Sequence, residues 1–231
     1  MHGWELSDVV HDTDEVAESL RFCGSGRLEQ LDLSSTELSC AGLVAVMPAV
    51  TAHSHLAELD LSTPLYERGV PRDGLTTVCE DLGSLSCLQK LALACDKPEQ
   101  AQATALASVL ISLTYISELS LTVQVYDEHD RRQIARIFVQ ALQNMLGMQR
   151  LKLCGLEFGD NSPELFEAFR SLSHLNRLSL KHCFMAEDVS SKVVHAVEPH
   201  ICLLEFIVPQ RYCGCEYSMG RWPEWVVLGA H

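Results

Sequence analysis

The residues of this chain that come nearest to a metal site are cysteines and histidines close to its C-terminus. Cys213 and Cys215 form a close pair, and with His200 or His231 they can supply ligands of the kind that zinc takes. Their one-residue spacer is shorter than the spacing of zinc ligands, and no second pair follows. We therefore expect no metal site.

Three other arrangements of residues resemble parts of nucleotide-binding or catalytic sites. Gly24-Ser25-Gly26-Arg27 lacks the spacing and the Lys-Ser/Thr end of a phosphate-binding loop. His182 and Cys183 are adjacent, and adjacent strand residues point to opposite faces, so they do not predict a nucleophile activated by a base. His53 and His55 fall in a short loop before a predicted strand, where we expect both in solvent. The sequence therefore predicts a protein that is not an enzyme and needs no cofactor.

Composition and charge narrow the class of protein further. The 231 residues are 47% hydrophobic, enough for a sizeable core, and carry 17 basic against 31 acidic side chains. A net charge of −14 disfavours nucleic acid and anionic membranes as partners. No basic leader and no apolar stretch of membrane-spanning length is visible, and most cysteines stand singly among apolar residues. We expect an acidic, cytoplasmic protein.

The feature that organises the chain is a repeated six-residue phrase, apolar-x-x-apolar-x-apolar. Its starts are separated by 28, 32, 28, 32, 27 and 26 residues, which is more regular than ordinary alternation of strands. Its fourth and sixth positions fall on one face of a short strand. The seven copies begin at Leu28, Leu56, Leu88, Ile116, Met148, Leu175 and Ile201.

Helical periodicity fills the segments between the phrases. Apolar residues recur there at the spacing of one helix face, as in Leu43, Val46, Met47 and Val50. A strand and a helix of this size cannot bury their apolar faces alone, so neighbouring units must stack. Stacking of identical units predicts a parallel sheet curved inside a ring of helices. The other helical segments lie within residues 75–85, 106–113, 134–145, 165–172 and 189–197.

The phrase, with a following segment such as Leu38-Ser39-Cys40-Ala41-Gly42-Leu43-Val44-Ala45-Val46, resembles the leucine-rich repeat superfamily in its long, ribonuclease-inhibitor-like class. The resemblance implies an α/β solenoid, or horseshoe, with a curved parallel sheet inside and helices outside. We expect a cap or truncated repeat in residues 1–27, seven repeats in 28–207 and a cap or tail in 208–231. The family places Asn or Cys three residues after the last strand leucine, where the side chain bonds loop backbone. Only Cys183 fits, the other copies holding Thr36, Pro64, Asp96, Gln124, Leu156 and Pro209.

The variable positions of the phrase predict a binding surface on the concave face of the sheet. Charged residues in the first two copies are acidic, and those in the fifth and sixth are basic, so we expect this face to be negative at one end and positive at the other. A surface split in this way orients a partner of the reverse pattern. The candidate residues are Glu29, Asp32, Glu58, Asp60, Lys90, Glu118, Arg150, Lys152, Arg177 and Lys181.

Two insertions extend the predicted binding surface. The second and fourth repeats are the longer ones, and their extra residues fall between strand and helix, within 63–72 and 123–132. Insertions on one edge of a repeat array often mark its binding edge, and each of these carries a tyrosine among charges. We add Tyr66, Arg68 and Tyr126 to the candidates. The reading as plain solvated loops stays open.

The sequence as a whole predicts a scaffold for protein–protein interaction that binds an unidentified protein partner. Two alternatives remain open, a GTPase-activating protein of the leucine-rich repeat type and a substrate receptor of a ubiquitin ligase. The last residues contain Tyr212, Tyr217, Trp222 and Trp225. This aromatic tail caps the final repeat or serves as a docking segment, and self-association through it is a further alternative.

Overall fold

The protein is an α/β molecule in which strands and helices alternate along the chain, as the repeated phrase predicts. Its structure is a computed structural model, which describes residues 3–5, 13–22, 28–34, 36, 38, 40–62, 72–159, 163–180, 182–185, 187–197, 203–206 and 226–229. Of the helices in these ranges, none combines the length and apolar character that crossing a lipid bilayer requires.

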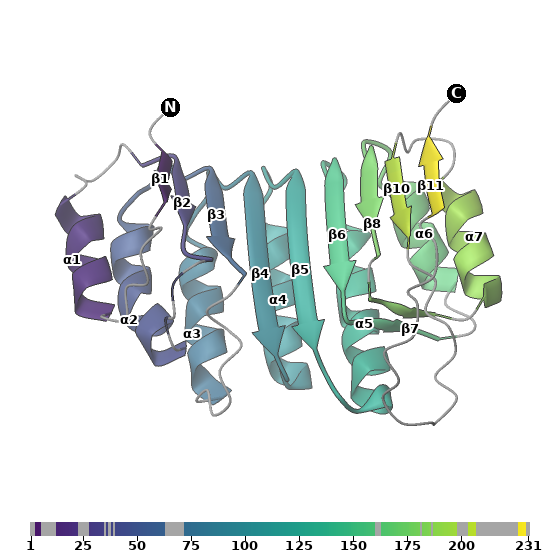
Figure 1. Cartoon of the computed structure of the whole chain (residues 1–231), viewed down its shortest axis with the longest axis horizontal. Coiled ribbons are helices and arrows are strands. Elements are labelled where there is room, and N and C mark those ends of the chain that lie inside the picture. The colour runs from purple at the N-terminus through teal and green to yellow at the C-terminus, as the bar shows by residue number, and fades with distance from the viewer. Residues whose placement is uncertain are drawn as a thin grey trace.

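One nine-stranded sheet runs through the molecule, with neighbouring strands following each other in chain order (Figure 1). All of its pairs are parallel except the last, β10 with β11. Each of the seven phrases supplies one strand. The strands are β1 (Gly3–Glu5), β2 (Gln30–Asp32), β3 (Glu58–Leu61), β4 (Lys90–Asp96), β5 (Glu118–Gln124), β6 (Arg150–Cys154), β8 (Arg177–Ser179), β10 (Leu203–Phe206) and β11 (Val226–Gly229).

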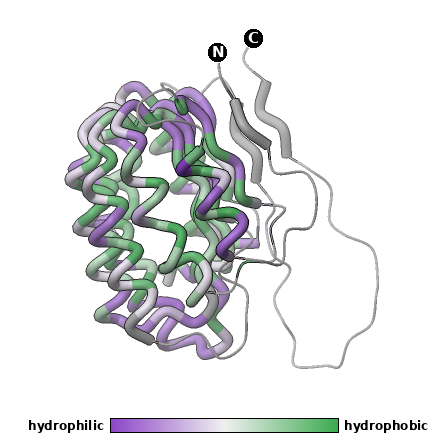
Figure 2. Tube along the Cα trace, turned by 90° about the vertical axis from the view of Figure 1, so that its left-hand side faces the viewer, coloured by the Kyte–Doolittle hydropathy of each residue, from purple (hydrophilic) through white to green (hydrophobic). Residues whose placement is uncertain are grey.

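The described helices form a second layer on one face of this sheet, behind the strands in Figure 1 and beside them when the molecule is turned (Figure 2). Each helix packs against the next along the chain. None of the helices in the described ranges covers the other face of the sheet. The helices are α1 (Thr13–Phe22), α2 (Cys40–Thr51), α3 (Arg72–Leu82), α4 (Gln100–Ser112), α5 (Glu128–Leu142), α6 (Pro163–Ser171) and α7 (Glu187–Val197).

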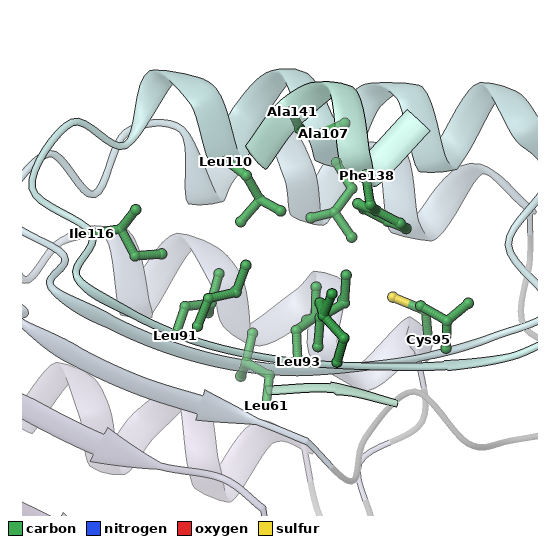
Figure 3. Packing of buried hydrophobic residues seen from close by; sticks show 14 of the residues in the cluster. Leu61, Leu91, Leu93, Cys95, Ala107, Leu110, Ile116, Phe138 and Ala141 are labelled. Carbon is green, nitrogen blue, oxygen red and sulfur yellow. The ribbon is translucent and has the colours of Figure 1, made fainter. Parts of the chain in front are cut away.

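The hydrophobic core lies between these two layers and is built from the apolar positions of the phrase. The fourth-position leucines are register partners across neighbouring strands, and none of them is more than 3% exposed. In Figure 3, Leu91 and Leu93 of β4 point toward Leu110 of α4 and Phe138 of α5. Burying one such side chain stabilises the fold by roughly 1.5–3 kcal/mol. The leucines with this burial are those of the first six copies, Leu31, Leu59, Leu91, Leu119, Leu151 and Leu178.

The first unit contains a strand that the analysis of the phrase missed. β1 pairs in parallel with β2, and Trp4 is the register partner of Leu31. Trp4 and Leu6 stand 27 residues before Leu31 and Leu33, at the spacing of the fourth and sixth phrase positions. That spacing is the signal that locates β1. Helix α1 follows β1, so residues 1–27, predicted as a cap or truncated repeat, contain both a strand and a helix.

The extra residues of the fourth repeat form less loop than expected. β5 continues to Gln124 and α5 begins at Glu128, so only residues 125–127 separate strand from helix. The carboxylate of Asp127 accepts a hydrogen bond from the Asp130 N–H (3.1 Å) and so caps α5. In the second repeat, residues 63–71 of the insertion lie outside the described residues.

The turns that follow β6 and β8 carry a small second sheet, in which β7 (Glu157–Phe158) pairs in parallel with β9 (Phe184–Met185). Gly155 makes the first of these turns with a φ of +80°, and a Cβ there would lie 1.8 Å from the carbonyl oxygen of Val123. Only glycine combines this backbone angle with so close an approach. The turn therefore depends on Gly155.

Buried polar side chains fix two of the turns after the phrase. Cys183 is fully buried, and its Sγ donates to the carbonyl of Leu153 (3.3 Å), which is the role predicted for it. Thr36 occupies the equivalent place in the first repeat, and its hydroxyl donates to the carbonyl of Leu33 (2.6 Å). The family pattern names only Asn or Cys here, yet the buried threonine also bonds the turn.

Candidate functional site

The face of the sheet opposite the helices, called here the open face, forms a hollow of about 720 Å³ that runs from β2 to β8. Strand alternation aims the third and fifth positions of each phrase into it, while the leucines point toward the helices. The side chains at these positions are Gln30, Asp32, Glu58, Asp60, Lys90, Ala92, Glu118, Ser120, Arg150, Lys152, Arg177 and Ser179.

Acidic side chains on β2 and β3 bond to their own strands. Asp32 Oδ1 accepts a hydrogen bond from the Ser34 N–H (2.8 Å), and Asp60 Oδ1 accepts one from the Ser62 N–H (2.9 Å). The two carboxylates are half-buried and thereby fix the backbone where each strand ends. Part of the negative charge at this end of the open face therefore serves the fold.

Two ion pairs cross the middle of the open face between register partners. Lys90 Nζ lies 2.7 Å from Glu58 Oε1, and Arg150 Nη1 lies 3.4 Å from Glu118 Oε2. The hydrogen bond with Glu58 raises the pKa of Lys90 above its ordinary value. Because these four charges neutralise one another in pairs, the third-position row is largely balanced from β3 to β6.

Basic side chains dominate the open face at β6 and β8. Lys152 projects from β6 and Arg177 from β8, and neither forms an ion pair with any side chain that the structure describes. Both line the hollow. The charge that remains for a ligand is thus concentrated at this end.

One candidate residue of the predicted sheet does not line the open face, and three further candidates lie outside the described residues. Glu29 precedes β2 and does not line the hollow, and its carbonyl accepts hydrogen bonds from the N–H groups of Ala57 (2.8 Å) and Glu58 (3.0 Å). Tyr66, Arg68 and Lys181 lie outside the described residues. Their binding roles stay predictions.

The candidates predicted from the sequence also lack four residues that line the hollow, namely Gln30, Ala92, Ser120 and Ser179. Each of them is uncharged, whereas all of the candidates predicted on the sheet are charged. Strand alternation alone could have found them, since each stands at a third or fifth phrase position. The same rule excludes Glu29, which stands at the second.

Tyr126 lies at the edge of the sheet where the fourth repeat carries its extra residues. Its side chain is 69% exposed, and Lys97 Nζ lies 4.7 Å from the centre of its ring. A second, shallower hollow of about 490 Å³ surrounds this contact. Tyr126 is thus held beside the first turn of α4, away from the open face.

A buried carboxylate anchors the turn that carries Tyr126. Glu157 of β7 is 9% exposed, and its two oxygens accept hydrogen bonds from Arg131 Nε (3.1 Å) and Arg132 Nε (2.9 Å). Arg131 also donates to the carbonyls of Val125 and Tyr126 (both 3.3 Å) and stacks over the ring of Phe184 at 4.4 Å. These contacts fix the conformation of the turn.

Cys183, the candidate nucleophile, and Cys79 are both shielded from reaction by burial. Burial raises the pKa of the Cys183 thiol to about 12, and burial with the nearby Glu80 carboxylate does the same for Cys79. A thiol with so high a pKa has almost no reactive thiolate at neutral pH. His182 and Cys183 lie in a turn after β8, and not on a strand, with His182 exposed and Cys183 buried.

The expectation that His53 is in solvent is wrong. Its side chain is 1% exposed, and Nε2 lies 3.2 Å from the carbonyl of Leu20 at the end of α1, to which it donates. The ring therefore connects α1 to the turn after α2, a contact that no local pattern reveals. His55 is exposed, as predicted.

Histidine, cysteine and carboxylate side chains are the groups of this protein that could hold a metal ion. Within the described ranges, no three of these residues come together in a way that could hold an ion. Cys213, Cys215, His200 and His231 lie outside those ranges.

The comparisons with known proteins found similar solved structures but no matching family model or curated sequence. No protein-family model matches the chain, and no curated protein matches it in sequence. Among solved structures, the tropomodulin C-terminal domain from Caenorhabditis elegans aligns with 82% of this chain and 93% of its own, at 11% identity and a TM-score of 0.49. A family 18 chitinase from Crocus vernus aligns with 83% of this chain and 78% of its own, at 13% identity and a TM-score of 0.28.

Proposed function

We propose that this chain is a leucine-rich repeat solenoid, curved as a horseshoe, that binds a protein partner on its open face without chemical catalysis. The observation that carries the proposal is the hollow of about 720 Å³ that runs from β2 to β8 with charged side chains of both signs along it. A surface of this length suits an extended or folded polypeptide better than a small molecule, which is usually enclosed in a pocket.

The charges along the open face support a partner that binds in one orientation. Lys152 and Arg177 attract acidic groups toward the β6 and β8 end, whereas the β2 and β3 end disfavours them. Complementary charge of this kind raises association rates and suppresses misaligned encounters. Tyr126 extends the proposed interface to the edge of the sheet, where Lys97 holds its exposed ring.

Charge reversal combined with affinity capture tests the proposal. We would compare the native chain with Lys152→Glu/Arg177→Glu and with a control of equal charge, Arg136→Glu/Arg170→Glu, whose residues are exposed on α5 and α6. The open-face variant should lose its partner several-fold at low salt and less at high salt, because salt screens exposed charges. The helix-face control should retain the partner.

A photo-crosslinking amino acid then locates the contact. Introduced at Ser120, in the middle of the open face, it should attach the partner, whereas at the exposed Ser108 of α4 it should not. Equal capture by both charge variants, together with crosslinking only from Ser108, would overturn the proposal.

A further inference from the structure

One corner of the open face gathers three cations and a hydroxyl group on two neighbouring strands. Arg150 and Lys152 of β6 are register partners of Arg177 and Ser179 of β8, and all four line the hollow. Neighbouring strands lie about 4.8 Å apart, and residues two apart along a strand are separated by about 6.6 Å. The long side chains of this β6–β8 corner can therefore converge on a group a few ångströms wide.

The hydroxyl of Ser179 gives an independent sign of a ligand. Its Oγ is buried and has no hydrogen-bond partner among the described residues. Nearly all buried polar groups in native proteins are paired, so an unpaired hydroxyl in the wall of a hollow is unusual. Ser179 has Lys152 of β6 as its register partner on one side and Glu205 of β10 on the other. An acceptor atom brought by a ligand would satisfy the hydroxyl once the atoms that cover the Oγ move aside.

The cations of the corner differ in what they already contact. Arg150 lies 3.4 Å from Glu118 and is partly neutralised. Lys152 and Arg177 have no ion-pair partner among the described side chains. Two positive charges and one hydroxyl donor are therefore left for a ligand at the corner.

We propose that the β6–β8 corner binds a phosphate monoester, carried as a phosphorylated side chain by the protein partner. A phosphate group has a charge near −2 and three acceptor oxygens, so it can pair with the Arg177 guanidinium, the Lys152 ammonium and the Ser179 hydroxyl together. A carboxylate has one negative charge and would leave the second cation uncompensated. The net charge of −14 disfavours a nucleic acid as the source of the phosphate. This inference rests on the proposed function.

Peptide libraries test the corner without knowledge of the partner. Fluorescent peptides of degenerate sequence with a central phosphoserine are titrated with the full chain, beside libraries that carry serine or glutamate at that place. Fluorescence anisotropy should give affinity for the phosphoserine library about tenfold or more above that for the serine library, because charge-assisted hydrogen bonds are strong. The glutamate library should fall between them.

Variants assign the preference to the corner. Lys152→Gln/Arg177→Gln should abolish the difference between the phosphoserine and serine libraries, and Ser179→Ala should reduce it a few-fold. Arg136→Gln/Arg170→Gln is the matched control, since it removes the same charge from exposed arginines of α5 and α6 that lie outside the open face. It should retain the preference. Circular dichroism of each variant checks that the chain remains folded.

Three results would overturn the inference. They are equal or absent binding of the phosphoserine and serine libraries, an equal loss in Arg136→Gln/Arg170→Gln, and tighter binding of a single-stranded RNA oligonucleotide that displaces the phosphopeptides. The proposed function is tested separately. A partner that crosslinks from Ser120 after phosphatase treatment, with unchanged affinity, would leave the interaction module standing and remove only the phosphate site.

Discussion

At the β2–β3 end of the open face, Asp32 and Asp60 accept hydrogen bonds from the backbone of their own strands, whereas at the β6–β8 end Lys152 and Arg177 pair with no described side chain. Asp32, Asp60 and Lys152 occupy the same position of the phrase, yet the acidic side chains hold turns and the lysine pairs with no described side chain. Position within a repeat therefore decides where a side chain points. Length and hydrogen-bonding capacity decide whether the fold itself uses it.

The largest loss of stability is expected when the turn after β6, at the basic end of the open face, is disrupted. Gly155→Ala should destabilise the protein by about 2–4 kcal/mol, because its Cβ would meet the Val123 carbonyl at 1.8 Å in a backbone conformation that alanine disfavours. Urea unfolding measures the change. Gly147→Ala is the control, since a Cβ there would lie 3.9 Å from the carbonyl oxygen of Ile116, which is ordinary van der Waals contact. Equal stability of the two variants would contradict the proposed role of Gly155.

A second substitution removes the buried acceptor that anchors the Tyr126 turn. Glu157→Gln should cost about 1–3 kcal/mol, because Arg131 and Arg132 lose the carboxylate that binds both guanidinium groups. Glu128→Gln breaks an exposed pair with Arg132 and should change stability by less than about 0.5 kcal/mol. Thermal unfolding of both variants gives the comparison. A larger loss in Glu128→Gln would refute the anchoring role of Glu157.

The contrast between acidic and basic ends predicts different costs for removing their charges. Asp60→Ala should destabilise the fold by about 0.5–1.5 kcal/mol, because the Ser62 N–H loses its acceptor. Lys152→Ala, at the equivalent position of β6, should stay within about 0.5 kcal/mol of the native chain. Chemical denaturation measures both. A larger loss of stability in Lys152→Ala than in Asp60→Ala would contradict the structural role of Asp60.

The smallest effect is expected from the ion pair between the ends. A double-mutant cycle with Glu58→Gln and Lys90→Met should give a coupling of about 0.2–1 kcal/mol that falls as salt rises. The pKa of Lys90 is raised in the folded state, so its contribution is present below the ordinary lysine value of 10.5 and is lost as the pH rises through the raised value. Coupling that persists beyond that pH would contradict the pairing with Glu58.

The sequence predicts the strands, helices and core well because these depend on periodicity. Each phrase copy forms a strand of the sheet, and its fourth-position leucines meet in register. The candidate site was predicted less completely. Selection by charge omitted Ser179, although strand alternation places it on the open face. Burial of His53 depends on a contact with α1 more than thirty residues earlier in the chain, which no local pattern contains.

The neighbour-to-neighbour packing of the helices has a consequence for how the molecule comes apart. Each helix contacts the next one along the chain, and the described strands pair in the same order. In such an array, stability is close to a sum over adjacent interfaces, so unfolding can start at an end and advance unit by unit. β4 and β5 pair over seven positions, the longest ladder of the sheet. The middle of the array should therefore be the last part to open, and the acidic and basic ends of the open face can lose their structure separately.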